Sequence, residues 1–182
     1  MSDGRPWYRE PESFIALTAL VVSVSAVVVG IYEASLQRAH DRAEVWPRVD
    51  VSTYVSPKTA SVTVANTGLG PAIIQSVIVT VDGKPYRNWD EVLEVLLGTS
   101  PKRRDERTVA ERALRGGDET TVLSVPMEEW PPGFWDYIGR VDVRICYASV
   151  FGDRWMLDRH LGARGAWQSV SRCPEQTAGT DF

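Results

Sequence analysis

The stretch FIALTALVVSVSAVVVGIY, from Phe14 to Tyr32, is an apolar run of nineteen residues without a charge or a proline. As an α-helix, with a rise of about 1.5 Å per residue, it would extend about 28 Å, close to the ~30 Å hydrocarbon thickness of a bilayer. A helix also satisfies its own backbone hydrogen bonds inside lipid. We therefore predict that residues 14–32 cross a membrane once and anchor the rest of the chain.

The sequence on either side of this run divides into further parts. We expect an irregular tail before it, in which Ser13 caps the membrane helix. After Tyr32 the residues turn polar but remain strong helix formers until Pro47, where a helix would lose a hydrogen bond. The predicted parts are an N-terminal tail (1–13), a transmembrane helix (14–32), a juxtamembrane helix (33–46), a β-sandwich domain (47–162) and a C-terminal tail (163–182).

A cleaved signal peptide is the alternative to an uncleaved signal-anchor, since residues 24–26 form a small-residue cleavage site. The apolar run continues to Tyr32, however, whereas the apolar core of a signal peptide normally has about 7 to 15 residues. Arginines flank the run on both sides, and the positive-inside rule favours a cytoplasmic N-terminus by a small margin. We expect a single-pass protein of the cell membrane with an extracytoplasmic domain.

Beyond Arg48 the apolar residues follow a period of two, which is typical of half-buried β-strands. This alternation predicts two antiparallel strands over residues 49–55 and 61–65. The β-branched run 73–81 is apolar on both faces and predicts a central strand, followed by a tight hairpin at Asp82–Gly83.

Several shorter elements complete the predicted domain. Asn88 is placed to cap a short helix over residues 89–97, and the segment MEEWPPGFWDYIG (127–139) should pack as an irregular flap over one end of the core. Two hairpins are expected, one from segments 108–114 and 120–125 and one from segments 141–149 and 154–157. About seven short strands indicate a mainly β fold, an antiparallel immunoglobulin-like β-sandwich with one short inserted helix. A small barrel is the alternative.

Four short motifs occur in a fixed order: VWPR at 45–48, NTGLGPA at 66–72, DGKP at 82–85 and ICYASVFGDRW at 145–155. Together with a single span, this order resembles a group of bacterial membrane-anchored β-sandwich proteins, over about residues 31–174. The resemblance implies an architecture and no activity. The chain departs from the group's pattern at two places where cysteines often stand, so no metal or redox role is carried over; these places hold Ala148 and Arg154.

Composition excludes one class of partner. The formal net charge is −4 and the sequence pI is about 5.3, so the chain lacks the basic footprint of a nucleic-acid-binding protein. The only cysteines, Cys146 and Cys173, pair if the domain is exported, or remain one buried and one exposed thiol if it is not. Two cysteines alone cannot make a four-ligand zinc site, and we expect neither a metal nor another cofactor.

The most distinctive turn contains Asn66, Gly68, Gly70 and Pro71. We interpret it as structural, with both glycines at positive φ and the proline fixing the exit into the next strand. The alternative is that its backbone N–H groups bind an anion, but no G-K-[ST] motif follows as in a phosphate-binding loop.

An aromatic cluster in the segment 127–139 is the candidate partner surface, since tryptophan and tyrosine dominate the energetics of interfaces. It consists of Trp130, Phe134, Trp135 and Tyr137. The alternative is that these rings form the lid of the hydrophobic core.

Other candidate sites have simpler interpretations. His160 follows Asp158 by two residues, but a catalytic triad would need a nucleophile such as Ser149 nearby, and no nucleophile-elbow motif is present. The charged run KRRDER (102–107) could meet anionic lipid head groups, but its acidic residues favour a solvated loop. We expect no catalytic residues.

The leading functional hypothesis is a non-catalytic module that binds or tethers another protein at the bilayer. Its expected partners are the lipid bilayer and another membrane or envelope protein, or a second copy through the span. The alternative is a sensor or effector whose β domain binds a small ligand and whose span oligomerises. Small residues on one face of the span, at Ser23, Ala26 and Gly30, would permit such packing.

Overall fold

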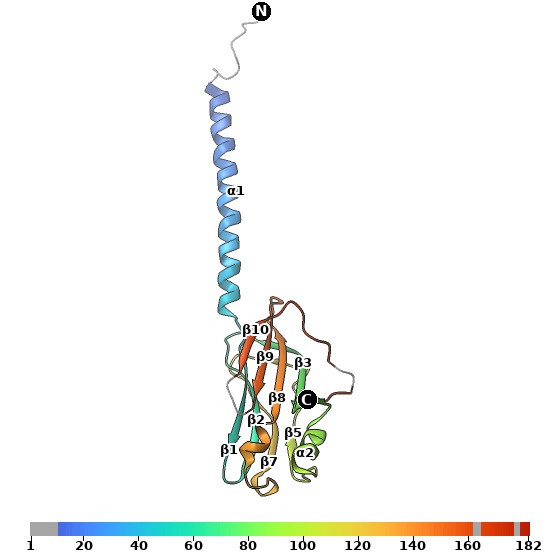
Figure 1. Ribbon diagram of the computed structural model, residues 1–182. Coiled ribbons are helices and arrows are strands. Elements are labelled where there is room, and N and C mark those ends of the chain that lie inside the picture. Colours follow the sequence, from blue (N-terminus) through green and yellow to red (C-terminus); the bar gives the residue numbers. More distant parts are fainter. Residues whose placement is uncertain (1–10, 162–164, 177–178) are drawn as a thin grey trace, which may run out of the picture. The chain divides into compact units, whose positions relative to one another are not determined.

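The computed structural model describes residues 11–161, 165–176 and 179–182 (Figure 1). The protein is mainly β, with two antiparallel sheets that follow a long apolar helix in the chain. Packing divides the chain into two compact units between Ala43 and Glu44. The first unit holds nearly all of the helix, and the second holds both sheets.

Helix α1 extends over Pro11–Glu44. The expectation that Ser13 caps it is wrong, because Ser13 lies inside the helix. Its polar side chains satisfy themselves locally, since the hydroxyls of Ser23 and Ser25 donate to backbone carbonyls one turn earlier. By length and composition, α1 is able to span a membrane.

Four strands form the first sheet, in the spatial order β1-β2-β7-β5. The predicted alternation is confirmed in β1 (Val49–Val55) and β2 (Thr59–Asn66), which pair antiparallel and turn their valines into the core. Strand β7 (Glu119–Pro126) pairs with β2, and the two-residue β5 (Asp105–Glu106) lies at the other edge.

Six strands form the second sheet, in which β10, β9, β8 and β3 run side by side (Figure 1). The predicted central strand is confirmed, because β3 lies between β8 and β4 and is followed by a hairpin in which Asp82 and Gly83 have φ angles of 49° and 78°. The predicted last hairpin is also confirmed as β8 and β9. The strands are β10 (Ala166–Ser169), β9 (Arg154–His160), β8 (Val141–Ala148), β3 (Ala72–Val81), β4 (Lys84–Tyr86) and β6 (Ala113–Leu114).

Helix α2 (Trp89–Leu97) begins and ends as predicted. The Oδ1 of Asn88 accepts a hydrogen bond of 2.9 Å from the Glu91 N–H, and Gly98 ends the helix at a φ of 74°. One face of α2 is buried and joins the hydrophobic core with the two sheets.

The segment 127–139 is more regular than predicted. It contains a single 3₁₀ turn, η2 (Met127–Glu129), and a short helix, α3 (Phe134–Ile138). Gly133, with a φ of 91°, precedes α3 in a conformation that favours glycine.

The predicted hairpin of segments 108–114 and 120–125 is wrong, because its two arms belong to different sheets. Strand β6 pairs with β3, whereas β7 pairs with β2. The turn between them is bound to the end of β2, since the Asn66 N–H donates to the Asp118 carbonyl and the Gly117 N–H donates to the Asn66 carbonyl. This attachment directs the arms to opposite sheets.

The predicted C-terminal tail (163–182) does not describe the residues that the structure shows after 164. Residues 166–169 form β10, which pairs with β9, and the side chain of Phe182 is only 1% exposed. The sequence signal was weak because most of this segment is polar.

Candidate functional site

Asn66 is a buried hydrogen-bonding centre at the end of β2. Its Oδ1 accepts hydrogen bonds from the backbone N–H groups of Arg48 and Gly68, each at 3.1 Å. Its Nδ2 donates to the carbonyl oxygens of Gly70 at 2.8 Å and Leu114 at 3.0 Å. One side chain therefore satisfies four backbone groups and fixes the start of β1, the β2–β3 loop and β6 against one another.

Gly68 and Gly70 are required by close backbone packing, and the positive φ angles predicted for them are wrong. A Cβ atom on Gly70 would overlap the Val45 carbonyl, and one on Gly68 would overlap the Trp46 carbonyl. The loop clamps the segment that precedes β1. The Leu69 N–H donates to the Trp46 carbonyl at 3.1 Å, and the Gly68 N–H donates to Asn66, so neither is free for an anion.

Exposed apolar side chains gather at the end of the sandwich where the β2–β3 loop lies. Of the eight exposed large apolar residues described after Glu44, five belong to segments at this end, with exposed fractions from 39% to 82%. We call these five residues the apolar end: Trp46, Leu69, Ile73, Val150 and Phe151.

Backbone pairing and ring contacts bring these segments together. Leu69 is hydrogen-bonded to Trp46, and Trp46 lies 6.1 Å from the ring of Trp155 at the start of β9. Ile73 is the cross-strand partner of Ala148, the last residue before the β8–β9 turn. That turn carries Val150 and Phe151, so three separate loops contribute to the apolar end.

Sequence reasoning missed the apolar end, although a local signal for it exists. Leu69 stands between two glycines, and Val150 and Phe151 directly precede Gly152. Turn positions are usually polar, so apolar residues at their tips are unusual and could have pointed to this surface.

The predicted aromatic surface does not form as one patch. Trp130 and Phe134 are 7% and 5% exposed and pack edge to face, with ring centroids 4.7 Å apart. These two rings belong to the core, as the alternative interpretation expected. Trp135 is 57% exposed and Tyr137 is half-buried.

A disulfide joins Cys146 on β8 to Cys173, with the two Cα atoms 5.6 Å apart. Cys146 is fully buried, whereas Cys173 is half-buried. Of the two states left open by the sequence, the structure has the paired one. The disulfide attaches the described residues after β10 to the six-stranded sheet; we call these residues, 170–176 and 179–182, the C-terminal strap.

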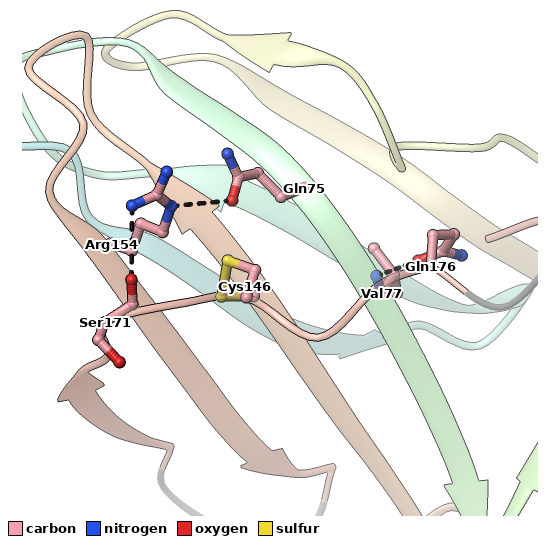
Figure 2. The surroundings of a disulfide bond; sticks show 7 residues. Gln75, Val77, Cys146, Arg154, Ser171 and Gln176 are labelled. Carbon is pink, nitrogen blue, oxygen red and sulfur yellow. Dashed lines mark hydrogen bonds between the residues drawn. A yellow bond between two sulfur atoms is a disulfide. The ribbon is translucent and has the colours of Figure 1, made fainter.

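Polar contacts hold the strap on either side of the disulfide, as Figure 2 shows. Arg154 lies between Gln75 and Ser171, donating from Nε to the Gln75 Oε1 at 3.3 Å and from Nη1 to the Ser171 carbonyl at 3.5 Å. Beyond the disulfide, the Val77 N–H donates to the Oε1 of Gln176 at 2.8 Å. Two strands of the sheet therefore bind the strap through side chains and backbone.

The last residues of the strap are held by main-chain hydrogen bonds. The Asp181 N–H donates to the Arg87 carbonyl at 2.7 Å. The Phe182 carbonyl accepts from the N–H groups of Val109 and Ala110, each at 2.9 Å. The strap thus closes the side of the sandwich between β4 and the β5–β6 connection.

The residues that a catalytic triad would need, which we did not expect to find, are not brought together. His160 Nδ1 lies 2.6 Å from Asp142 Oδ1, its cross-strand partner. Ser149 lies at the other end of β8, where its Oγ accepts a hydrogen bond from the Phe151 N–H at 3.2 Å. A histidine and an aspartate without a nucleophile cannot carry out triad chemistry.

Two of the three arginines in the basic run 102–107 pair with acidic residues of the same domain. Arg103 forms an ion pair with Glu128, and Arg104 pairs with Asp90 at 2.5 Å and with Glu106 at 3.2 Å. These pairs compensate the positive charge that an anionic surface would need.

The space between the sheets is small. A cavity of about 10 Å³ lies there, lined by apolar side chains that include Val51, Val122 and Ile145. This volume holds about one water molecule and no organic ligand. Within the described residues, no three histidine, cysteine or acidic side chains are grouped as a metal would require.

No protein-family model matches this sequence, and no curated protein is significantly similar to it. Function is therefore inferred from the surfaces of the domain.

Proposed function

We propose that this protein is a single-pass membrane protein whose immunoglobulin-like β-sandwich binds another membrane or envelope protein through the apolar end, without catalysis. The observation that carries the proposal is the gathering of exposed apolar residues from three loops at one end of the domain. Clustered exposed apolar residues mark interaction sites, and aromatic anchors such as Trp46 and Phe151 commonly supply most of the binding free energy.

Rigid supports strengthen the proposal. Leu69 is 82% exposed, yet its loop is fixed by the four side-chain hydrogen bonds of Asn66 and by the packing of Gly70 on Val45. A binding surface that is already ordered loses little conformational entropy when a partner docks. The exposed apolar side chains are therefore suited to specific binding.

The disulfide supports an extracytoplasmic position for the domain. Disulfides form and persist in oxidising compartments and are rare in the cytosol. With the Cys146–Cys173 bond outside and α1 in the bilayer, the N-terminus would lie in the cytoplasm.

A membrane-impermeant thiol reagent applied to intact cells tests this orientation. We expect the reagent to label Cys173 and Cys146 from outside the cell, and only after the disulfide has been reduced and the domain unfolded. Free thiols that react only after cell lysis would instead place the domain in the cytoplasm.

Site-specific photocrosslinking tests the binding surface. A photoreactive amino acid is placed at Leu69 and, as a matched control, at Tyr54, which is 65% exposed at the opposite end of β1. In native membranes we expect a discrete protein adduct from position 69 and none from position 54.

The crosslink must also depend on the apolar end itself. Phe151→Asp should abolish the adduct formed at position 69, while Tyr54→Asp should leave it unchanged, since both side chains are exposed and neither change should unfold the domain. Equal adducts from both positions, or an adduct that survives Phe151→Asp, would contradict the proposal.

A further inference from the structure

The end of the C-terminal strap lies in the domain as a bound peptide lies in a receptor. The side chain of Phe182 is 1% exposed and meets Trp89 edge to face, with ring centroids 5.4 Å apart. Val109 and Val77 line the same apolar space between the sheets. This geometry is a pocket filled by a single aromatic side chain.

Main-chain pairing surrounds that pocket. Asp181 forms a parallel β-bridge with Asn88, and its N–H donates to the Arg87 carbonyl at 2.7 Å. The Asp181 carboxylate accepts a hydrogen bond from the Thr108 hydroxyl. The main-chain oxygen of Phe182 accepts two hydrogen bonds, from the N–H groups of Val109 and Ala110. Main-chain hydrogen bonds with a side-chain pocket are the recurring pattern of strand-addition peptide recognition.

We propose that the groove between residues 87–89 and 108–110 is a peptide-binding site, occupied in this chain by Thr180–Phe182. Its ligand would be an extended segment of a partner protein in which an aromatic residue follows an acidic one. The acidic side chain would bind Thr108, and the aromatic ring would enter the pocket beside Trp89. This site is separate from the apolar end and independent of it.

The chain's own segment competes with any such ligand. Cys173, attached to β8 by its disulfide, stands nine residues before Phe182, so the tether is short. Short flexible tethers give effective concentrations on the order of millimolar. A free peptide would therefore bind poorly to the unchanged chain and well to a chain whose own occupant has been weakened.

Competition with a synthetic peptide tests the site in the full-length protein held in lipid nanodiscs. The probe is a fluorescent, C-terminally amidated peptide of residues 175–182, EQTAGTDF. We expect saturable binding to the Phe182→Ala variant and a higher Tm for that variant in the presence of peptide. A control peptide carrying Phe182→Ala should have an affinity at least about tenfold lower, because it lacks the buried ring.

Phe182→Leu serves as the second variant, since it keeps an apolar side chain in the pocket and preserves folding better than alanine. The peptide should displace this variant's own, more weakly bound C-terminal residues. Its affinity for the unchanged chain should be at least about tenfold lower. Failure of the peptide to bind folded Phe182→Leu, or equal binding of the alanine control peptide, would overturn the proposal. A dimer that requires Phe182 and resists the peptide would assign the groove to a second copy of this chain and would also overturn it.

Discussion

The backbone of Gly70 packs directly against the carbonyl of Val45, leaving no space for a Cβ atom. Gly70→Ala should therefore lower the free energy of unfolding by about 2 to 3 kcal/mol, because one of the two backbones must move. Thermal unfolding followed by near-UV circular dichroism should show a Tm about 6 to 12 °C lower. Gly152→Asn is the control, since nothing lies within 4 Å of the missing Cβ of Gly152 and asparagine tolerates a positive φ such as its 84° better than most residues. A similar loss in both variants would contradict this explanation.

Removing the side chain of Asn66 should be among the most harmful single changes. Asn66→Ala leaves two N–H groups and two carbonyls without their side-chain partner, and we expect a loss of about 3 kcal/mol or more. Urea denaturation measures the change. A loss below about 1 kcal/mol would show that water replaces the amide easily.

Asn66→Asp gives a related prediction with a pH dependence. The carboxylate would face the carbonyl oxygens of Gly70 and Leu114, which raises the pKa of the new acid. A raised pKa in the folded state means that this acid stabilises the fold when protonated and destabilises it as pH rises through that pKa. The variant should therefore recover part of the lost stability at pH 4 relative to pH 7, when each is compared with the unchanged protein.

Replacing both Cys146 and Cys173 by serine should lower the free energy of unfolding by about 3 to 4 kcal/mol, since the bond closes a 27-residue separation. Guanidinium denaturation of the oxidised protein and the double variant gives the difference. Reduction of the unchanged protein should give a similar loss. A double variant as stable as the oxidised protein would show that the strap is held by its hydrogen bonds and by Phe182 alone.

Two neighbouring tryptophans should respond differently to truncation. Trp130→Ala removes a 7% exposed ring packed on Phe134 and should cost about 3 to 5 kcal/mol. Trp135→Ala removes a 57% exposed ring and should change stability by about 0.5 kcal/mol or less. Thermal denaturation of both variants checks this contrast, and equal losses would contradict it.

Tyr147 should make the domain sensitive to alkaline pH. Burial raises the pKa of its hydroxyl, although a hydrogen bond with the Val49 backbone and the charge of Arg48 act in the opposite direction. The unfolded chain therefore loses this proton at lower pH than the folded chain, and stability falls as pH rises above about 10. Tyr147→Phe should remove this part of the pH dependence, which denaturation curves at pH 9 and pH 11 would show. An unchanged slope would assign the effect to other groups.

The elements that sequence patterns predicted correctly are those decided by neighbouring residues. The alternation of β1, the β-branched run of β3 and the Asn88 cap of α2 are local signals, and the structure contains each of them. The prediction of a hairpin from segments 108–114 and 120–125 was wrong because the turn between them is bound to Asn66, about fifty residues earlier in the sequence. Local composition carries no information about such a partner.

The candidate sites were harder to predict than the strands for the same reason. The apolar end exists only because the loops carrying Trp46, Leu69 and Phe151 meet in space. The core position of Phe182 depends on a strap that crosses the sheet after a polar stretch. Each feature needs the tertiary structure before its residues can be recognised as a group.

The burial of Phe182 also has a consequence for the timing of folding. Synthesis proceeds from the N-terminus, so Trp89 and the strands around it leave the ribosome long before the ring that packs against Trp89. Until residue 182 emerges, the nascent domain carries an unfilled apolar gap and an unpaired edge at Asn88. Its sheets can form as the chain elongates, but the packing on Trp89 waits until Phe182 has been synthesised.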